Sequence, residues 1–208
     1  MAKQGLLIVI SGFSGAGKGT IVKQLVSQYG YSLSISCTTR SPREGEVDGK
    51  DYHFKTREEF KRLIDYNGFI EYAQYVENYY GTPRAFVEEE MAKGNHVILE
   101  IEVQGAMNIK RQYPEAVLLF ITAPSAGELK ARLEGRGSED TKAVEKRMKQ
   151  AIVESNSMST YDYIVVNDDL ETCVKHIHDI IDAETSKSCH KVDFIEQIKQ
   201  ELKEIGKE

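Results

Sequence analysis

The amino-acid sequence predicts an α/β fold in which a parallel β-sheet is covered by helices on both faces. Four short apolar runs carry this prediction, at residues 6–10, 97–101, 116–121 and 163–166. Each run is continuous rather than alternating, which is typical of strands buried on both faces. Segments with helical periodicity separate the runs, and this alternation of strand and helix favours a parallel sheet.

Local signals place the remaining elements along the chain. A helix is predicted at 17–29, directly after the first run, and a weaker strand near 32–37 follows it. Several predicted helices begin with Ser or Thr followed closely by Glu, as in the sequence KTREEF at the start of 56–65. The other helices are predicted at 83–93, 125–134, 141–158 and 170–184.

Two segments depart from the alternation of strand and helix. Residues 38–95 are rich in Arg, Gly and Tyr and poor in aliphatic residues, so we expect an insertion built around a polar pocket. Gly135 and Gly137 lie between two predicted helices and could act as hinges, so we expect a mobile lid at about 135–157. Together with the sheet, these segments form one predicted domain over residues 1–187.

Residues 188–208 predict a separate amphipathic helix at the carboxyl end of the chain. Its apolar residues recur at helical spacing on one face, at Val192, Ile195, Ile198, Leu202 and Ile205. We expect this face to pack against the chain's own domain rather than against a partner.

Composition excludes several classes of function. The chain has 208 residues, 40% of them hydrophobic, and a formal net charge of −6, which argues against a general nucleic-acid or anionic-membrane surface. Its apolar runs are too short for a signal peptide or a membrane span, so we expect a cytoplasmic protein. Three cysteines without a C-x-x-C motif suggest neither disulfides nor zinc. A metal site that joins Cys189 and His190 to His176 and His178 is not expected either, because the last two diverge on a helix.

The segment GFSGAGKGT, residues 12–20, predicts a binding site for the phosphates of a nucleoside triphosphate. Glycines between a buried strand and a helix let backbone N–H groups converge on an anion, and the helix N-terminus adds its positive dipole. Lys18 would reach the terminal phosphates. Gly19 stands where the phosphate-loop pattern has Ser or Thr, so Mg²⁺ would be held through water, the phosphates and Thr20. The predicted ATP-binding residues are Gly12, Ser14, Gly15, Ala16, Gly17, Lys18, Gly19 and Thr20.

A second group of residues indicates a second phosphate site. Ser36, Arg40, Arg43, Tyr52 and Tyr80 offer hydroxyls and guanidinium groups suited to phosphate oxygens. Two arginines three residues apart are ordinarily a solvated surface, and the nearby phosphate loop makes a site the better interpretation. A second anion site beside an ATP site predicts phosphoryl transfer between nucleotides.

Over residues 5–185 the sequence resembles the guanylate kinase family, whose members transfer a phosphoryl group from ATP to GMP on a P-loop nucleoside monophosphate kinase fold. Six spaced motifs carry the resemblance: GFSGAGKGT, TTRSPREGEVDGKDYHF, FIEYAQYVENYYGTP, LEIEVQGA, RLEGRG and VNDDL. It implies that Ser36, Arg40, Arg43, Tyr52 and Tyr80 hold the GMP phosphate, that Glu71, Thr82 and Glu102 contact guanine, and that Arg132, Arg136 and Arg147 close over the transferred group.

The sequence departs from the family pattern at three places. Phe13 replaces a usual proline in a loop that acts through its backbone, and Thr82 replaces a frequent serine while keeping the hydroxyl. Glu100 and Glu102 are both glutamate where the family usually has at least one aspartate, so the role of Glu102 follows less directly than that of Glu71.

The chemistry of guanine agrees with these residues. Its pairing edge presents two adjacent donors, which a carboxylate such as Glu71 can accept, and an oxo group, to which Thr82 can donate. Adenine would leave the carboxylate unpaired. Lys18, Arg40, Arg132, Arg136, Arg147 and Mg²⁺ would neutralise the transferred phosphoryl group. Glu100, at a strand end, could organise the waters of Mg²⁺ or could be a pocket-lining acid with a structural partner.

The sequence therefore predicts a cytoplasmic ATP:GMP phosphotransferase whose partners are ATP, GMP or dGMP, and Mg²⁺, with no nucleic acid or membrane. Two alternatives stay open: a kinase for AMP or a pyrimidine nucleotide, and a catalytically inactive, guanylate-kinase-like module that binds proteins. The oligomeric state is not predicted.

Overall fold

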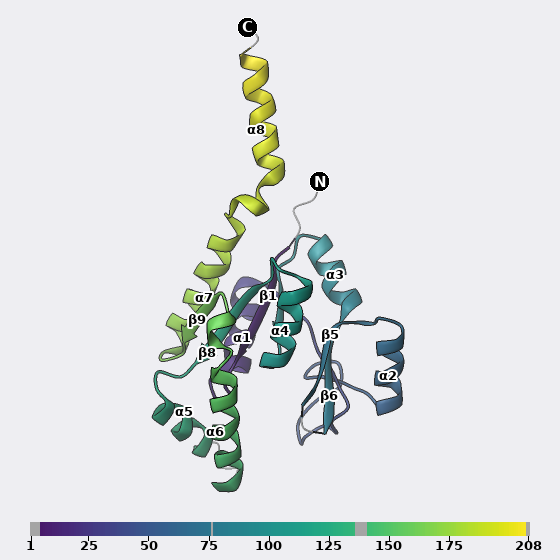
Figure 1. The fold of residues 1–208 in the computed structure, drawn as a ribbon, viewed down its shortest axis with the longest axis vertical. Helices are drawn as coiled ribbons and strands as arrows, with labels where there is room; N and C mark the ends of the chain where they lie inside the picture. The colour runs from purple at the N-terminus through teal and green to yellow at the C-terminus, as the bar shows by residue number, and fades with distance from the viewer. Residues whose placement is uncertain (1–4, 76, 136–140, 207–208) are drawn as a thin grey trace.

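The computed structural model describes residues 5–75, 77–135 and 141–206 (Figure 1). Its centre is a five-stranded parallel sheet with the order β2-β7-β1-β8-β9. The strands span Leu7–Gly12 (β1), Ser32–Leu33 (β2), Val97–Glu100 (β7), Val117–Thr122 (β8) and Tyr163–Val166 (β9). β1 therefore lies in the middle, paired with β7 on one side and β8 on the other. The four short apolar runs are confirmed as strands of one parallel sheet.

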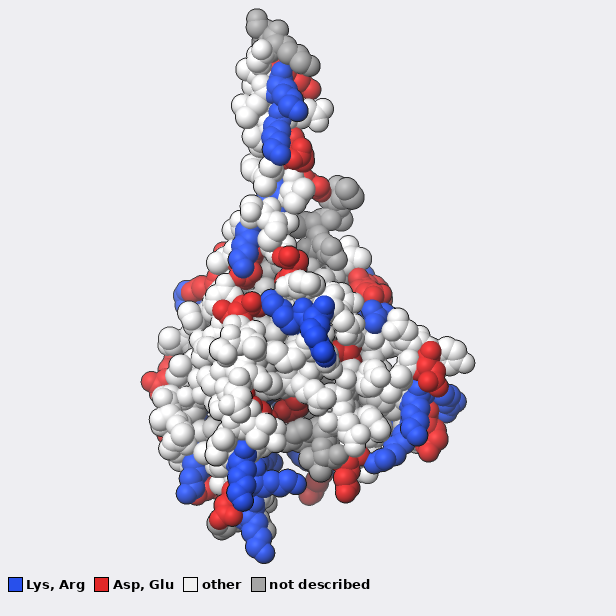
Figure 2. Space-filling view, viewed as in Figure 1, with Lys and Arg blue, Asp and Glu red and all other residues white. Residues whose placement is uncertain are grey.

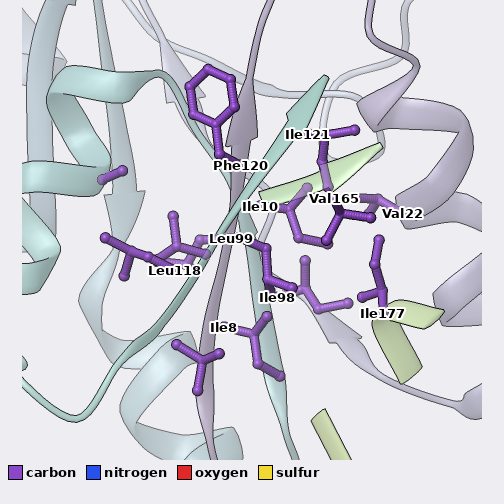
Figure 3. Packing of buried hydrophobic residues seen from close by; sticks show 14 of the residues in the cluster. Ile8, Ile10, Val22, Ile98, Leu99, Leu118, Phe120, Ile121, Val165 and Ile177 are labelled. Carbon is purple, nitrogen blue, oxygen red and sulfur yellow. The ribbon is translucent and has the colours of Figure 1, made fainter. Parts of the chain in front are cut away.

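Helices cover both faces of this sheet (Figure 1). α1 (Lys18–Tyr29) and α7 (Leu170–Thr185) pack together on one face, and α4 (Val103–Gln112) lies on the other. Val22 of α1 and Ile177 of α7 contribute to the core beside Ile10 (Figure 3). Leu118 and Phe120, on the opposite face, are also fully buried. Burial on both faces explains why the strands are continuously apolar.

A second, smaller sheet forms within residues 38–95 and just before them. Its strands have the order β4-β3-β6-β5 and span Cys37–Thr38 (β3), His53–Phe54 (β4), Phe69–Tyr75 (β5) and Asn78–Pro83 (β6). β5 and β6 form an antiparallel pair, which the sequence analysis did not predict. Cys37, Phe60 and Phe69 give this sheet a small core of its own.

The helices next to this small sheet are those predicted. α2 (Arg57–Asp65) begins with a capping box in which the Thr56 hydroxyl accepts from Glu59 N. α3 (Arg84–Ala92) follows β6 directly.

Two further helices lie at the end of the molecule opposite α8 (Figure 1). They are α5 (Ala126–Glu134) and α6 (Thr141–Ser155), and the short η1 (Met158–Thr160) follows α6. Arg136, predicted as a lid arginine, lies outside the described residues.

α4 is a helix that the sequence analysis missed. Its sequence, VQGAMNIKRQ, contains Gly105 and Asn108, which lower helix propensity, and it follows a strand after only two residues. Packing of Val103, Ala106 and Ile109 against the sheet offsets that weak propensity.

The expectation that the last helix packs against its own domain is wrong. α8 (Val192–Ile205) forms as predicted after η2 (Ser188–His190), but none of its described residues is buried. The chain turns outward between α7 and α8, so α8 projects from the molecule (Figure 1). Charged side chains cover its near side in Figure 2, while Leu202 and Ile205 are 63% and 69% exposed.

Among the helices of the described residues, none combines the length and apolar composition that crossing a membrane requires.

Candidate active site

The glycine-rich loop lies where β1 ends and α1 begins. Gly12, Gly15 and Gly17 all have positive φ angles, of 134°, 89° and 93°, which other residues rarely adopt. Gly17 is the N-cap of α1, and the helix starts at Lys18. The loop therefore turns directly into a helix N-terminus, whose free N–H groups and positive dipole end suit phosphate.

Two of these glycines are also required by close contacts. A Cβ at Gly12 would lie 2.1 Å from the Ile121 carbonyl oxygen, and one at Gly17 would lie 2.4 Å from Asn167 Nδ2. Asn167 donates from Nδ2 to the Ala16 carbonyl at 2.8 Å and is 7% exposed. Asn167 thus braces the loop from the end of β9. No role was predicted for Asn167, although it belongs to the motif VNDDL. Its place directly after a buried strand was the signal in the sequence that could have indicated a role at the site.

Lys18 folds back over the loop. Its Nζ donates to the carbonyl oxygens of Gly12 at 2.7 Å and Phe13 at 3.1 Å. This position holds the ammonium group beside the loop N–H groups, where a terminal phosphate would lie.

Glu100 lies opposite, at the end of β7. A Cβ at Gly19 would be 3.6 Å from Glu100 Oε1, so the carboxylate faces the first turn of α1. Burial raises the pKa of Glu100, the nearby Lys18 opposes this rise, and Glu102 adds to it. Thr20, on the same turn of α1, is exposed. Carboxylate and hydroxyl oxygens are the ligands that Mg²⁺ prefers, directly or through water, so these residues fit the expected ion.

Glu154 of α6 is a further acid in this region that the sequence analysis missed. It is 6% exposed, accepts a hydrogen bond from Gln150 Nε2 at 3.1 Å, and its pKa is raised by burial and by Glu102. It lies ten residues after the buried Val144 and three after the buried Ala151. A glutamate on the apolar face of a helix was the available signal.

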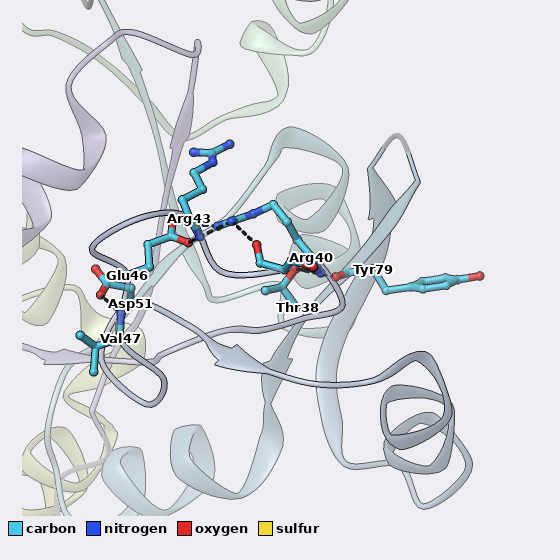
Figure 4. Close-up of polar contacts among 8 residues, drawn as sticks. Thr38, Arg40, Arg43, Glu46, Val47, Asp51 and Tyr79 are labelled. Carbon is cyan, nitrogen blue, oxygen red and sulfur yellow. Dashed lines mark hydrogen bonds and ion pairs between the residues drawn. The ribbon is translucent and has the colours of Figure 1, made fainter. Parts of the chain in front are cut away.

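Arg40 is held in place before any ligand binds. Its Nη1 and Nη2 donate to the two carboxylate oxygens of Glu46 at 2.9 and 2.8 Å (Figure 4). The guanidinium also lies 5.3 Å from the centre of the Tyr52 ring. The Tyr80 ring centre is 6.1 Å from that of Tyr52, so the structure brings three of the five predicted phosphate-binding residues together. Glu46, which orients the arginine, was not predicted.

Tyr52 directly precedes β4 of the small sheet. Burial raises its pKa to about 12, and the charge of Glu100 is the next largest cause. Tyr52 is therefore near enough to the end of β7 to experience the charge of Glu100.

For Arg43 and Ser36 the structure defines the backbone position rather than a side-chain contact with Arg40, Tyr52 or Tyr80. The Arg43 backbone N–H donates to Glu46 Oε2 at 2.7 Å, but its exposed side chain points away from the Arg40–Glu46 pair (Figure 4). The Ser36 carbonyl accepts from His53 N at 2.9 Å, which fixes its backbone beside β4.

Glu71 and Thr82 form a buried polar pair between β5 and β6. The Thr82 hydroxyl donates to Glu71 Oε1 at 2.8 Å. Thr82 is 0% exposed and Glu71 is 5% exposed. Burial raises the pKa of Glu71 to about 7. A Cβ at Gly105 would lie 2.7 Å from Glu71 Oε2, so the first turn of α4 covers this carboxylate closely. Oε1 accepts from the threonine, which leaves Oε2 and further lone pairs to accept from a base.

Glu102, the third predicted guanine contact, is the N-cap residue of α4 and its side chain is exposed. It lies at the same helix end as Gly105 but is not bonded to the Glu71–Thr82 pair.

Two predicted lid arginines already contact the donor region. Arg147 of α6 donates from Nη1 to the Ser14 hydroxyl at 2.6 Å. Arg132 of α5 donates from Nη1 to the Asn167 carbonyl at 2.9 Å and from Nε to Glu128 at 2.9 Å. Both guanidinium groups therefore lie at the carboxyl edge of the sheet, near the glycine-rich loop.

Comparison with known proteins agrees with this arrangement. The family model for guanylate kinase matches residues 4–184. The chain is 50% identical over 200 residues to the guanylate kinase of Caldanaerobacter subterraneus subsp. tengcongensis, covering 96% of this chain and 97% of the relative. It is 50% identical over 189 residues to that of Bacillus subtilis, covering 90% and 93%. The chain belongs to the guanylate kinase family.

A solved structure supports the same assignment. The crystal structure of guanylate kinase from Anaplasma phagocytophilum superimposes with a TM-score of 0.77 at 34% identity, covering 91% of each chain. Membership of the guanylate kinase family confirms the expected fold and the expected activity, ATP-dependent phosphorylation of GMP. The roles of individual residues stay predictions.

Proposed function

We propose that this guanylate kinase binds ATP at the glycine-rich loop and GMP between the small sheet and α4, and transfers the γ-phosphoryl group between them. The observation that carries this division of the site is the buried Glu71–Thr82 pair. It offers one hydroxyl donor and carboxylate acceptors in an enclosed position, which matches the pairing edge of guanine.

The donor half would act through charge and position. Loop N–H groups and the N-terminus of α1 would hold the phosphates, and Lys18 would leave its two carbonyl partners to contact the terminal phosphate. Arg147 and Arg132, which lie beside the loop, would offset charge on the transferred group.

In the acceptor half, Arg40 would bind the GMP phosphate together with Tyr52 and Tyr80. Glu46 engages one edge of the Arg40 guanidinium and so restricts its rotation, while other N–H donors stay available. An oxygen of the GMP phosphate would attack the γ-phosphorus, and ADP would leave on the opposite side.

The acceptor base would be selected by hydrogen bonding. Guanine N–H groups would donate to Glu71, and the Thr82 hydroxyl would turn from Glu71 to the guanine oxo group. Because guanine is shared by GMP and dGMP, both would be accepted. Adenine would place a ring nitrogen acceptor against the buried carboxylate in place of the N–H donors of guanine, which costs a few kcal/mol.

Mg²⁺ would accompany ATP, held through water by Glu100 and Thr20. When bound, the ion neutralises phosphate charge. A cytoplasmic place of action stays a prediction of the sequence.

A coupled assay of ADP release with ATP and Mg²⁺ tests this division of the site. Turnover is expected with GMP and dGMP and should be at least about a hundredfold lower in kcat/KM with AMP, CMP or UMP. Lys18→Ala should remove nearly all turnover, whereas the control Lys61→Ala, on the exposed face of α2, should keep it. Comparable turnover with AMP, or an active Lys18→Ala protein, would contradict the proposal.

A further inference from the structure

Three side chains with metal-binding atoms meet at the base of α8, outside the active site. They are Glu115, Cys189 and His190. One carboxylate oxygen, the Cys189 sulfur and one imidazole nitrogen all lie within 4.8 Å of one another. Glu115 is distant in sequence from the other two, so tertiary structure rather than chain proximity brings it there.

The backbone holds both segments in place. Cys189 and His190 belong to η2, in which His190 N donates to the Lys187 carbonyl at 3.0 Å. Glu115 lies in a turn closed by a bond of 2.9 Å from Ala116 N to the Tyr113 carbonyl. The turn leads into the buried strand β8, and η2 follows α7, which packs on the sheet. Each segment is therefore anchored to the core.

Within residues 5–75, 77–135 and 141–206, these three side chains make no hydrogen bond or ion pair. Cys189 is a free, exposed thiol, and Glu115 is exposed as well. Among the described residues, no hydrogen bond or ion pair of these side chains has to break for their atoms to bind a cation.

The donor set favours a particular class of ion. Thiolate, imidazole and carboxylate together are ligands of borderline-soft Zn²⁺, whereas Mg²⁺ prefers oxygen alone. Ligand atoms of tetrahedral zinc lie about 3–4 Å apart, given bond lengths of about 2.0–2.3 Å. Glu115 and Cys189 are exposed and His190 is half-buried, so small rotations of these side chains would bring their ligand atoms to that spacing.

We propose that Glu115, Cys189 and His190 form a zinc site with three protein ligands and a fourth position for water, which fastens the base of α8 to the turn before β8. The site is separate from phosphoryl transfer. Glu115 precedes β8, at the amino edge of the parallel sheet, whereas the glycine-rich loop follows β1 at the carboxyl edge (Figure 1). A metal was not expected at Cys189 and His190 from the sequence, because the set considered joined them to His176 and His178, which diverge on a helix, and left out Glu115.

Cobalt titration of the reduced, chelator-treated full-length protein tests the proposal. One Co²⁺ per chain should bind and give the near-ultraviolet absorption of a cobalt thiolate, and Zn²⁺ should displace it. Cys189→Ser should abolish this band, and Glu115→Gln and His190→Gln should each weaken binding by at least about tenfold. The controls Glu171→Gln and His176→Gln, on α7, should bind as the wild type does.

A second measurement follows the proposed fastening of α8. Trypsin can cleave after Lys187 and Lys191, which flank the two ligands. Zn²⁺ should slow these cleavages several-fold in the wild type but not in the Cys189→Ser protein. Phosphoryl transfer to GMP should be the same in all ligand variants, because the site lies at the other edge of the sheet.

Several results would overturn the proposal. They are a wild-type protein without the thiolate band, a Cys189→Ser protein that keeps it, and a control variant that loses it. A ratio of one Co²⁺ to two chains would contradict a site within one chain and indicate a site shared between two copies. Loss of kinase activity in correctly folded ligand variants would show that the site is not separate from catalysis.

Discussion

Glu71, the proposed guanine contact, is buried at an electrostatic cost to the folded protein. Its carboxylate is 5% exposed, and burial raises its pKa to about 7. An unfolded glutamate has a pKa of about 4.3. The contribution of Glu71 to the stability of the folded protein is therefore fully present below about pH 4.3. It is lost as the pH rises through about 7, because the folded state then has to ionise a buried acid. A bound guanine would supply the donors that the ionised carboxylate lacks.

We therefore expect Glu71→Gln to stabilise the ligand-free protein. At pH 8 the free energy of unfolding should rise by about 1–3 kcal/mol, and the gain should shrink as the pH falls toward 5. Urea denaturation at pH 5, 6.5 and 8 measures it. Glu102→Gln, at an exposed acid near the same helix end, should change stability by less than about 0.5 kcal/mol. A destabilised Glu71→Gln protein at pH 8 would contradict the burial cost.

At the scale of elements, the loop after β1 depends on the residue after β9. The Asn167 side chain donates to the Ala16 carbonyl, and the Asn167 backbone carbonyl accepts from Arg132. Asn167 thereby joins the glycine-rich loop to α5.

Asn167→Ala should therefore damage ATP use. Removing the bond to a buried carbonyl costs about 1–3 kcal/mol, so kcat/KM for ATP should fall about tenfold or more. Asn167→Asp should be worse, since its carboxylate would face a carbonyl and the ATP phosphates. Asn95→Ala is the matched control, because the Asn95 side chain donates to Glu90 Oε2 at 2.8 Å on the surface. Equal activity of Asn167→Ala and Asn95→Ala would show that the brace is unimportant.

The element farthest from the site is α8. It buries none of its described residues, so it should add little to the stability of the domain. Removing residues 188–208 should change Tm by less than about 2 °C in metal-free buffer and leave kcat unaltered. Calorimetry and the ADP-release assay measure both. A fall in Tm of about 5 °C or more would mean that α8 is packed in solution, on this chain or on another copy.

At the scale of the whole molecule, the proposed site draws on two sheets. The carboxyl edge of the parallel sheet gathers Lys18, Glu100, Arg132 and Arg147, and the segment that forms the small sheet carries Arg40, Tyr52, Glu71 and Thr82. The charge of Glu100 contributes to the raised pKa of Tyr52, so these two members of the two sets lie near each other. Phosphoryl transfer needs that arrangement, because two phosphates must be brought into line in a site shielded from water.

Much of this fold could be predicted from the sequence, since the four buried strands are continuously apolar and the glycine-rich loop has local signals. The hairpin β5–β6 was missed because its many tyrosines hide any alternation of apolar and polar residues. Asn167 was missed for another reason, because tertiary structure brings it to Ala16 from far along the chain. Glu46 lies only six residues from Arg40, but the loop conformation that pairs them has no regular sequence pattern. The direction of α8 likewise depends on the turn after α7 and not on the apolar face of the helix.

The central claim is that this chain selects GMP through Glu71, and Glu71→Gln tests it most directly. The amide keeps the shape of the side chain but presents a donor to a guanine N–H. Catalytic efficiency with GMP should fall by about 2–4 kcal/mol in transition-state stabilisation, while efficiency with AMP should fall far less or rise. The control Thr82→Ser keeps its hydroxyl and should retain the wild-type preference.

The measurement is the ratio of kcat/KM for GMP to kcat/KM for AMP, determined for the wild type, Glu71→Gln and Thr82→Ser. A sharp fall of this ratio in Glu71→Gln alone is the predicted result. If the two efficiencies shift together, or if neither shifts, then Glu71 does not select the base and this account of the acceptor site is wrong.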